Sequence, residues 1–154
     1  MRSRLPSLLV CGILLRTVSA SAVPGRTFAA TETSPQALVT TYFHVFNSIT
    51  KGGSLDQLTQ IYAPSATLVV ATPDGKTSTF AGLPAISGWY KTFAAGHPGL
   101  QAKQVSVRAP LPGMVIHYEL AYNAAGALAG RCAHFFAVVN GMIVSDDFVV
   151  YWGH

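Results

Sequence analysis

The first regular pattern of hydrophobic and polar positions begins after Ser34 and has the spacing of an α-helix. Large apolar side chains recur at intervals of three and four residues, at positions 38, 42, 45, 46 and 49. A serine followed by a proline is typical of a helix start, because the serine hydroxyl caps free amide groups and proline suits the first turn. We therefore predict a helix that begins at Pro35 and ends before Gly52.

Two further helices are predicted by similar patterns. Ser54 and Gln57 have the spacing of a capping box ahead of a short second helix, which Pro64 ends. A third helix is expected to begin near Pro84, because large apolar residues again follow at helical spacing. These residues are Ile86, Trp89, Tyr90 and Phe93.

The remaining segments predict strands. The run 67–72 is rich in β-branched residues, and a turn after it leads into a return strand that ends near Ala81. Four more strands are expected over 100–109, 114–123, 128–140 and 142–152. Asn140 and Gly141 between the last two are typical of a type I′ hairpin turn. Early helices and a late meander predict an α+β domain over 34–154, a strongly curved antiparallel sheet with three N-terminal helices packed on its concave face.

The composition fits a single globular domain. The chain has 154 residues, of which 50% are hydrophobic and only 10% are charged, so a disordered tail is excluded. The formal net charge is +4, but Arg2, Arg4 and Arg16 all lie within residues 1–22. Without that segment, seven basic side chains face six acidic ones, and they are scattered along the chain. We therefore expect no nucleic-acid partner.

Residues 1–22 have the three parts of a secretory signal peptide. Two arginines precede an apolar run over 8–15, and small residues lead up to Ala22. The apolar run is shorter than the roughly 20 residues that a membrane span needs. We expect cleavage after Ala22, a linker over 23–33, and a secreted or periplasmic domain with no membrane partner after cleavage. Cys132 would then be the only cysteine, and we expect it to be a buried side chain rather than a nucleophile.

Four phrases along the chain resemble those of a known family. They are Tyr62-Ala63-Pro64-Ser65-Ala66-Thr67, Phe80-Ala81-Gly82-Leu83-Pro84-Ala85-Ile86, His134-Phe135-Phe136 and Asn140-Gly141-Met142-Ile143. Together with the helix pair before them, they are similar to the SnoaL-like branch of the nuclear transport factor 2-like superfamily over residues 35–152. The resemblance implies a cone-shaped domain that encloses a pocket. Steroid isomerases, polyketide cyclases, epoxide hydrolases and non-catalytic proteins share this fold, so the resemblance does not decide the function.

The resemblance to the steroid isomerase branch also implies which strand positions face the interior. It aligns Ala133 and Phe135 with inward positions, and side chains alternate between the two faces of a strand. The inward side chains would then be mostly apolar, which suits a small hydrophobic ligand. The residues expected to line this pocket are Trp89, Tyr118, Tyr122, Arg131, Phe135 and Phe148.

Of the catalytic residues of the steroid isomerases, which this chain resembles, one has a counterpart here. Tyr42, five residues before Asn47, matches their oxyanion-holding tyrosine. Their two acids are not kept, because the general base corresponds to Val70 or Thr72 and the second acid to Ala133. Isomerisation by that route is therefore not expected.

Limonene epoxide hydrolase, another relative, combines an arginine with two aspartates. Here Arg131 matches the arginine, the first aspartate is lost, and Asp146 could stand for the second. A carboxylate inside an apolar cone would have a raised pKa and could act as a general acid or base, so Asp146 and Tyr42 are the candidate catalytic residues. The alternative is a structural ion pair between Asp146 and Arg131. A register slip of one residue would make Asp147 the inward acid.

No metal and no cofactor are expected. No two of the five histidines have close ligand spacing with a third donor, and no glycine-rich phosphate loop occurs. In the expected register His117, Glu119 and His134 lie on the outer face of the sheet, where relatives of this fold often meet a second subunit. A homodimer through this face is therefore expected. The alternative function is a non-catalytic association domain whose cone is filled by its own side chains.

Overall fold

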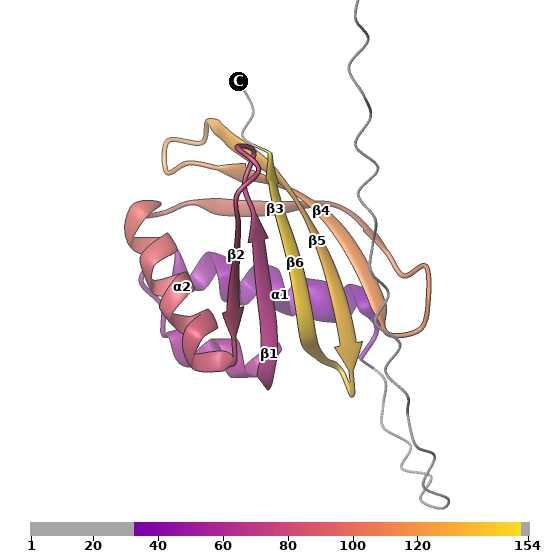
Figure 1. Cartoon of the computed structure of the whole chain (residues 1–154). Coiled ribbons are helices and arrows are strands. Elements are labelled where there is room, and N and C mark those ends of the chain that lie inside the picture. The colour runs from indigo at the N-terminus through magenta and orange to yellow at the C-terminus, as the bar shows by residue number, and fades with distance from the viewer. Residues whose placement is uncertain (1–32, 152–154) are drawn as a thin grey trace, which may run out of the picture.

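The computed structural model describes residues 33–151, which form two α-helices, a short 3₁₀ helix and six strands (Figure 1). The elements in chain order are α1 (Pro35–Ile49), η1 (Leu55–Gln60), β1 (Tyr62–Ala71), β2 (Thr77–Ala81), α2 (Leu83–Gly96), β3 (Gln101–Arg108), β4 (Met114–Tyr122), β5 (Leu128–Val139) and β6 (Met142–Tyr151). The predicted signal peptide over 1–22, and all but the last residue of the predicted linker, lie outside the described residues.

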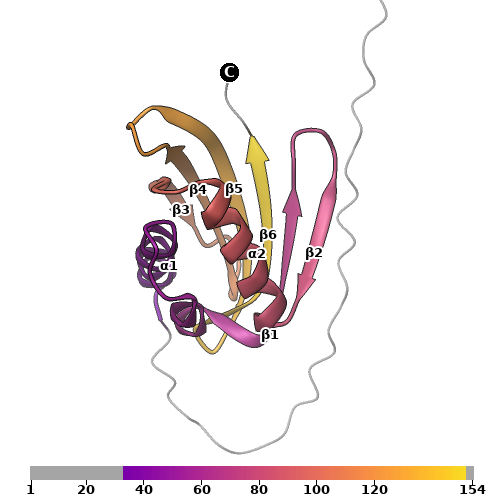
Figure 2. The same cartoon turned by 90° about the vertical axis from the view of Figure 1, so that its left-hand side faces the viewer.

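The six strands form one sheet in the order β2-β1-β6-β5-β4-β3. The sheet curves, and α1 and α2 lie on the same side of it (Figure 2). The predicted α+β class, with helices against one face of a curved sheet, is confirmed. The sheet is mixed rather than wholly antiparallel, because β1 and β6 run parallel. Strand β6 therefore runs antiparallel to β5 on one side and parallel to β1 on the other.

The first helix forms as predicted, and the second differs. The Ser34 hydroxyl accepts a hydrogen bond from the amide of Ala37 at 3.1 Å, which caps α1. The second helix is a six-residue 3₁₀ segment, and Tyr62 already belongs to β1. Pro64 lies where the pairing of β1 with β6 shifts between Tyr62 and Thr67, so its missing amide hydrogen interrupts no regular ladder.

The hairpin between β5 and β6 decides which side chains face the helices. Asn140 and Gly141 both have positive φ, 51° and 76°, as the predicted type I′ turn requires. Val138 lies opposite Ile143, but the next residue of β5, Ala137, lies opposite Ser145. One residue of β6, Val144, is therefore an extra residue in the ladder, which is a β-bulge. Beyond the bulge, the residue opposite Asp146 is Phe136.

The apolar core fills the space between the concave face of the sheet and the helices. Helix α1 contributes one long buried face, and Ile86 and Tyr90 of α2 are buried beside it. Cys132 is buried in this core, as expected, and burial raises the pKa of its thiol. Within residues 33–151, no helix has the length and apolar character of a membrane span.

Candidate functional site

Seven titratable side chains lie together inside the core, and each exposes at most 2% of its surface. Strand alternation places His117 and Glu119 on the inward face of β4, and the pairing of β4 with β5 sets His134 directly opposite His117. Asp146 faces inward from β6, while three tyrosines reach in from α1, β1 and α2. We call these residues the polar cluster: Tyr42, Tyr62, Tyr90, His117, Glu119, His134 and Asp146.

The centre of the polar cluster is the pair formed by His134 and Asp146. Nδ1 of His134 lies 2.8 Å from Oδ1 of Asp146, so the imidazole donates to the carboxylate. The ring of Phe148 stacks on the imidazole, with 4.2 Å between ring centroids. Nε2 of the same imidazole lies 3.1 Å from the hydroxyl oxygen of Tyr42. The carboxylate and the stacked ring together fix the orientation of the histidine.

Two tyrosines from the other side of the core complete the surroundings of Asp146. The Tyr62 hydroxyl donates a hydrogen bond of 2.5 Å to Oδ2 of Asp146. The hydroxyl oxygen of Tyr90 lies 3.2 Å from that of Tyr62. Both carboxylate oxygens therefore have a donor, which is what a buried carboxylate needs to remain in an apolar core.

The least satisfied end of the polar cluster is formed by His117 and Glu119. Nε2 of His117 lies 3.3 Å from Oε2 of Glu119, and Nε2 of His134 lies 3.9 Å from Oε1 of Glu119. The two imidazoles are stacked with their centroids 4.5 Å apart. Nδ1 of His117 is buried and has no hydrogen-bond partner within the described part of the chain. A buried nitrogen without a partner costs stability.

The residues of the polar cluster shift one another's pKa values. Burial alone would lower the pKa of His134, but the adjacent Asp146 raises it to about 9. Burial alone would raise the pKa of Glu119, but hydrogen bonds from the two histidines lower it to about 2. Burial lowers the pKa of His117 and raises that of Tyr42. The tyrosine hydroxyl therefore stays protonated and can donate a hydrogen bond.

This arrangement can bind a polar group and exchange a proton with it. An imidazole held by a carboxylate can accept or return a proton, and neutral phenol groups can donate hydrogen bonds to an oxygen that gains negative charge. Aromatic rings surround the polar groups, since Phe136 and Phe148 pack on His134. Polar groups that converge within apolar walls are the usual makeup of a small-molecule site.

Three of the residues that the sequence singles out lie in the polar cluster or against it. Asp146 and Tyr42, the candidate catalytic residues, are both members, and Phe148 packs against His134. The inward acid is Asp146 rather than Asp147, which is exposed. The half-buried Trp89 approaches the site from α2, with its ring centroid 5.9 Å from that of Phe148.

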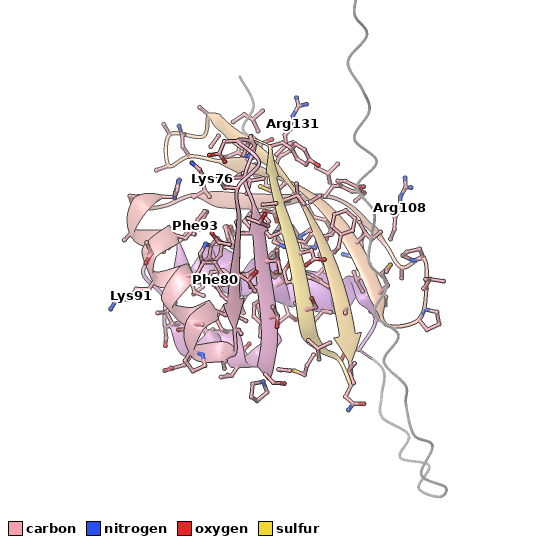
Figure 3. All side chains as sticks on the ribbon, viewed as in Figure 1. Lys76, Phe80, Lys91, Phe93, Arg108 and Arg131 are labelled. Atoms are coloured by element: carbon pink, nitrogen blue, oxygen red, sulfur yellow. The ribbon has the colours of Figure 1, made fainter. Side chains whose placement is uncertain are left out.

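The other four expected pocket residues do not face the interior. Tyr118 and Phe135 are exposed by 44% and 38%, and Tyr122 is half-buried on the same outer face. Arg131 is exposed and projects away from the body of the domain (Figure 3). The expected ion pair between Asp146 and Arg131 is therefore wrong. The physical reason is the bulge at Val144, which reverses the facing of β5, and hence of β4, relative to β6.

The same reversal brings three residues expected on the outer face into the core. His117, Glu119 and His134 are buried, so a dimer interface on the outer face cannot be made of them. The expectation of no metal site assumed that these residues lie far apart, whereas their donor atoms all lie within 4.8 Å of one another. These three residues could therefore hold a metal ion. The alternation of His117 and Glu119 with the larger apolar side chains of β4 is a signal for two of them, but it fits an outward face equally well.

The two hollows that we describe lie outside the polar cluster. The larger, about 490 Å³, lies between the start of α1, the β3–β4 loop and the β5–β6 turn. The other, about 360 Å³, lies between the turn after α2 and the β4–β5 turn. Leu38 and Val115 line the larger hollow. Leu38 lies about one helical turn before Tyr42, and Val115 lies two residues before His117 on the same strand face, so this hollow adjoins the polar cluster.

Comparison with known proteins identifies the fold. No protein-family model matches the sequence, and no curated protein matches it. Among solved structures, a candidate SnoaL-like polyketide cyclase from Jannaschia sp. CCS1 superposes with a TM-score of 0.65 and 12% identity, over 82% of this chain and 91% of that one. The chain has the SnoaL-like fold of the nuclear transport factor 2-like superfamily. The resemblance noted in the sequence is therefore confirmed for the fold.

Two further structures with the SnoaL-like fold are similar over most of their length. A candidate isomerase of the SnoaL-like family from Agrobacterium tumefaciens superposes with a TM-score of 0.62 and 11% identity, over 75% of this chain and 95% of that one. IdmH, a candidate polyketide cyclase from Streptomyces antibioticus, gives a TM-score of 0.59 and 16% identity, over 75% and 91%. The likeness is one of fold, so the chemistry has to be argued from the polar cluster itself.

Proposed function

We propose that this SnoaL-like domain binds a small, largely apolar organic molecule that carries an oxygen group. The ligand would place its oxygen against the polar cluster, where His134, protonated below its pKa of about 9 and held by Asp146, acts as the general acid and Tyr42 as a hydrogen-bond donor. The observation that carries the proposal is the fully buried His134–Asp146 pair, enclosed by tyrosine hydroxyls and aromatic rings. So many titratable groups in one core reduce stability, and such sets are concentrated at functional sites.

The larger hollow supplies room for the apolar part of the ligand. Its volume of about 490 Å³ falls in the usual range of ligand pockets, roughly 300 to 1,000 Å³. Its walls are mostly apolar and include Pro35, Leu38, Pro110 and Val115. Leu38 and Val115, which line the hollow, would have to move for a ligand seated there to reach the polar cluster.

The comparisons support a small-molecule ligand. Two of the structures with this fold are candidate polyketide cyclases, and a third is a candidate isomerase. Both descriptions concern conversions of small organic molecules. At 11 to 16% identity these structures are alike in fold only, so the reaction has to be found by experiment on this chain.

A thermal-shift screen with steroids, terpenoids and aromatic polyketides tests the proposal. A ligand at a hundred times its dissociation constant should stabilise the domain by about 2.7 kcal/mol. Binding should be lost in Leu38→Trp, which fills the hollow, and weakened in Tyr42→Phe, which removes one hydroxyl. Asp147→Asn is the matched control, because this exposed carboxylate neighbours Asp146 but faces outward. Ligands that bind Leu38→Trp as well as the parent would contradict the proposed site.

A second candidate function is association through the outer face of the sheet. Large apolar side chains are exposed there on neighbouring strands β4, β5 and β6. They include Tyr118, Leu128, Phe135 and Tyr151. An exposed apolar patch of this kind is typical of a protein interface. These side chains, in place of the buried His117, Glu119 and His134, would contact a second copy of the chain.

We also propose that the domain is exported. The support is the composition of residues 1–22, whose basic start, apolar run and small residues suit a signal peptide. Mass spectrometry of the protein recovered outside the cytoplasm should find Val23 as its first residue. Recovery of the chain from the cytoplasm with Met1 intact would contradict the proposal.

A further inference from the structure

We propose that His117, Glu119 and His134 form a binding site for one divalent metal ion of the zinc class. The site lies on the inward faces of β4 and β5, at the end of the polar cluster away from Tyr62 and Tyr90. It goes beyond the proposed ligand binding, and it does not depend on it, because it concerns side chains that meet whether or not an organic molecule is bound.

The spacing of the donor atoms suits a metal better than it suits direct hydrogen bonds. The two contacts to the carboxylate of Glu119 measure 3.3 Å from His117 and 3.9 Å from His134. Charge-assisted hydrogen bonds are shorter, about 2.7 to 2.9 Å. Bonds of about 2.0 to 2.2 Å around a tetrahedral ion place neighbouring ligand atoms roughly 3.3 to 3.6 Å apart. Small movements of the His134 and Glu119 side chains would complete that geometry.

The ligand set itself is one that zinc and similar ions use. Two imidazoles and one carboxylate leave a fourth position open, as in catalytic zinc sites. The same three ligands, with more coordination positions left open, also bind ferrous iron. The site would therefore suit a divalent ion that is neither strongly hard nor strongly soft, such as Zn²⁺ or Fe²⁺. The hydroxyl of Tyr42, now 3.1 Å from Nε2 of His134, would give up that contact when Nε2 binds the ion.

The surroundings already contain the outer contact that metal-bound histidines usually make. Nδ1 of His134 donates to Asp146 at 2.8 Å, which leaves Nε2 to face Glu119 and the proposed ion. A carboxylate behind a ligating histidine fixes its tautomer and strengthens it as a ligand. Asp146 is therefore a positioning residue for the metal rather than a ligand.

The two histidines differ in their outer contacts, and the nearby charges fit a bound cation. Nδ1 of His117 has no hydrogen-bond partner among residues 33–151, so this imidazole would bind the ion through Nε2 without the outer contact that His134 has. The two carboxylates, Glu119 and Asp146, are buried together, and one divalent ion with two neutral imidazoles would balance their charge.

Cobalt(II) titration of the purified, chelator-treated protein tests the site, because Co²⁺ replaces zinc and absorbs visible light when its coordination is tetrahedral. One equivalent should bind, and zinc should displace it. Glu119→Gln should abolish the absorption, and Asp146→Asn should weaken affinity by about 10- to 100-fold. His44→Ala, which removes an exposed histidine of α1, and Asp147→Asn should both leave binding unchanged.

The parent protein alone keeps the test decisive if a variant fails to fold. Zinc at saturating concentration should raise the melting temperature of the parent and leave a stoichiometry of one ion per chain. Absence of cobalt uptake by the folded parent, or uptake that persists in folded Glu119→Gln, overturns the proposal. The screen for organic ligands is run on the chelator-treated protein, so its result and the metal result can fail independently.

Discussion

His134 and Asp146 meet across neighbouring strands, with 2.8 Å between Nδ1 and Oδ1, and neither side chain exposes more than 1% of its surface. A buried carboxylate remains in an apolar core only when it has hydrogen-bonded partners. Here the partners are an imidazole and a tyrosine hydroxyl rather than an arginine. The stability of the core and any proton transfer in it therefore depend on the same two residues.

Replacing Asp146 by asparagine should destabilise the domain by about 3 to 5 kcal/mol, because the change breaks a buried pair and leaves His134 with a poorer partner. Urea titration of the free energy of unfolding measures this. Asp147→Asn, on the adjacent exposed position, should change it by less than about 0.5 kcal/mol. Equal effects of the two substitutions would show that the contact with His134 does not stabilise Asp146 in the core.

A double-mutant cycle should assign the partner of Asp146 directly. Asp146→Asn and His134→Gln should be coupled by about 0.5 to 3 kcal/mol, since the side chains touch. Asp146→Asn and Arg131→Met should be additive within about 0.5 kcal/mol, because Arg131 lies on the outer face. Coupling with Arg131 but not with His134 would restore the ion pair that the sequence suggested.

The outer face of the sheet should mediate dimer formation through Tyr118 and Phe135. Phe135→Lys places a charge at the centre of the apolar patch, and it should shift a concentration-dependent dimer to monomer in analytical ultracentrifugation. Leu111→Lys is the control, because this exposed leucine lies in the β3–β4 loop, away from the strands. A parent protein that sediments as a monomer at every concentration would remove the basis for association as its function.

Cys132 should resist thiol reagents in the folded protein. Its side chain is 6% exposed, so a reagent reaches it only when the domain opens. Mass spectrometry of the peptide that contains Cys132 should show little labelling in buffer and full labelling in denaturant. Rapid labelling under native conditions would mean that β5 opens readily around this residue.

The elements with local signals could be predicted from the sequence. Ser34 caps α1, and Asn140 and Gly141 form the turn, because both signals act within a few residues. The inward position of Asp146 on β6 was also predictable from its alternation with Phe148. The end of the short second helix was not, because Tyr62 joins β1 through pairing with β6, which lies far along the chain.

The candidate site was predictable only in part, and one residue explains why. A two-residue turn with an unbroken ladder would place Phe135 opposite Asp146, whereas the extra residue Val144 places Phe136 there. A shift of one position exchanges the two faces of a strand, so His117 and His134 become inward side chains. Aromatic residues occupy the other face, so hydrophobicity favoured the wrong register.

The parallel contact between β1 and β6 makes the last strand the closing piece of the sheet. While the chain is still being synthesised, β1 has no partner on that side, and Tyr62 lacks the carboxylate that its hydroxyl meets in the finished fold. Contacts between distant segments form slowly, and open strand edges invite aggregation in the meantime. A nascent chain that stops short of β6 would therefore be a target for chaperones rather than a smaller stable domain.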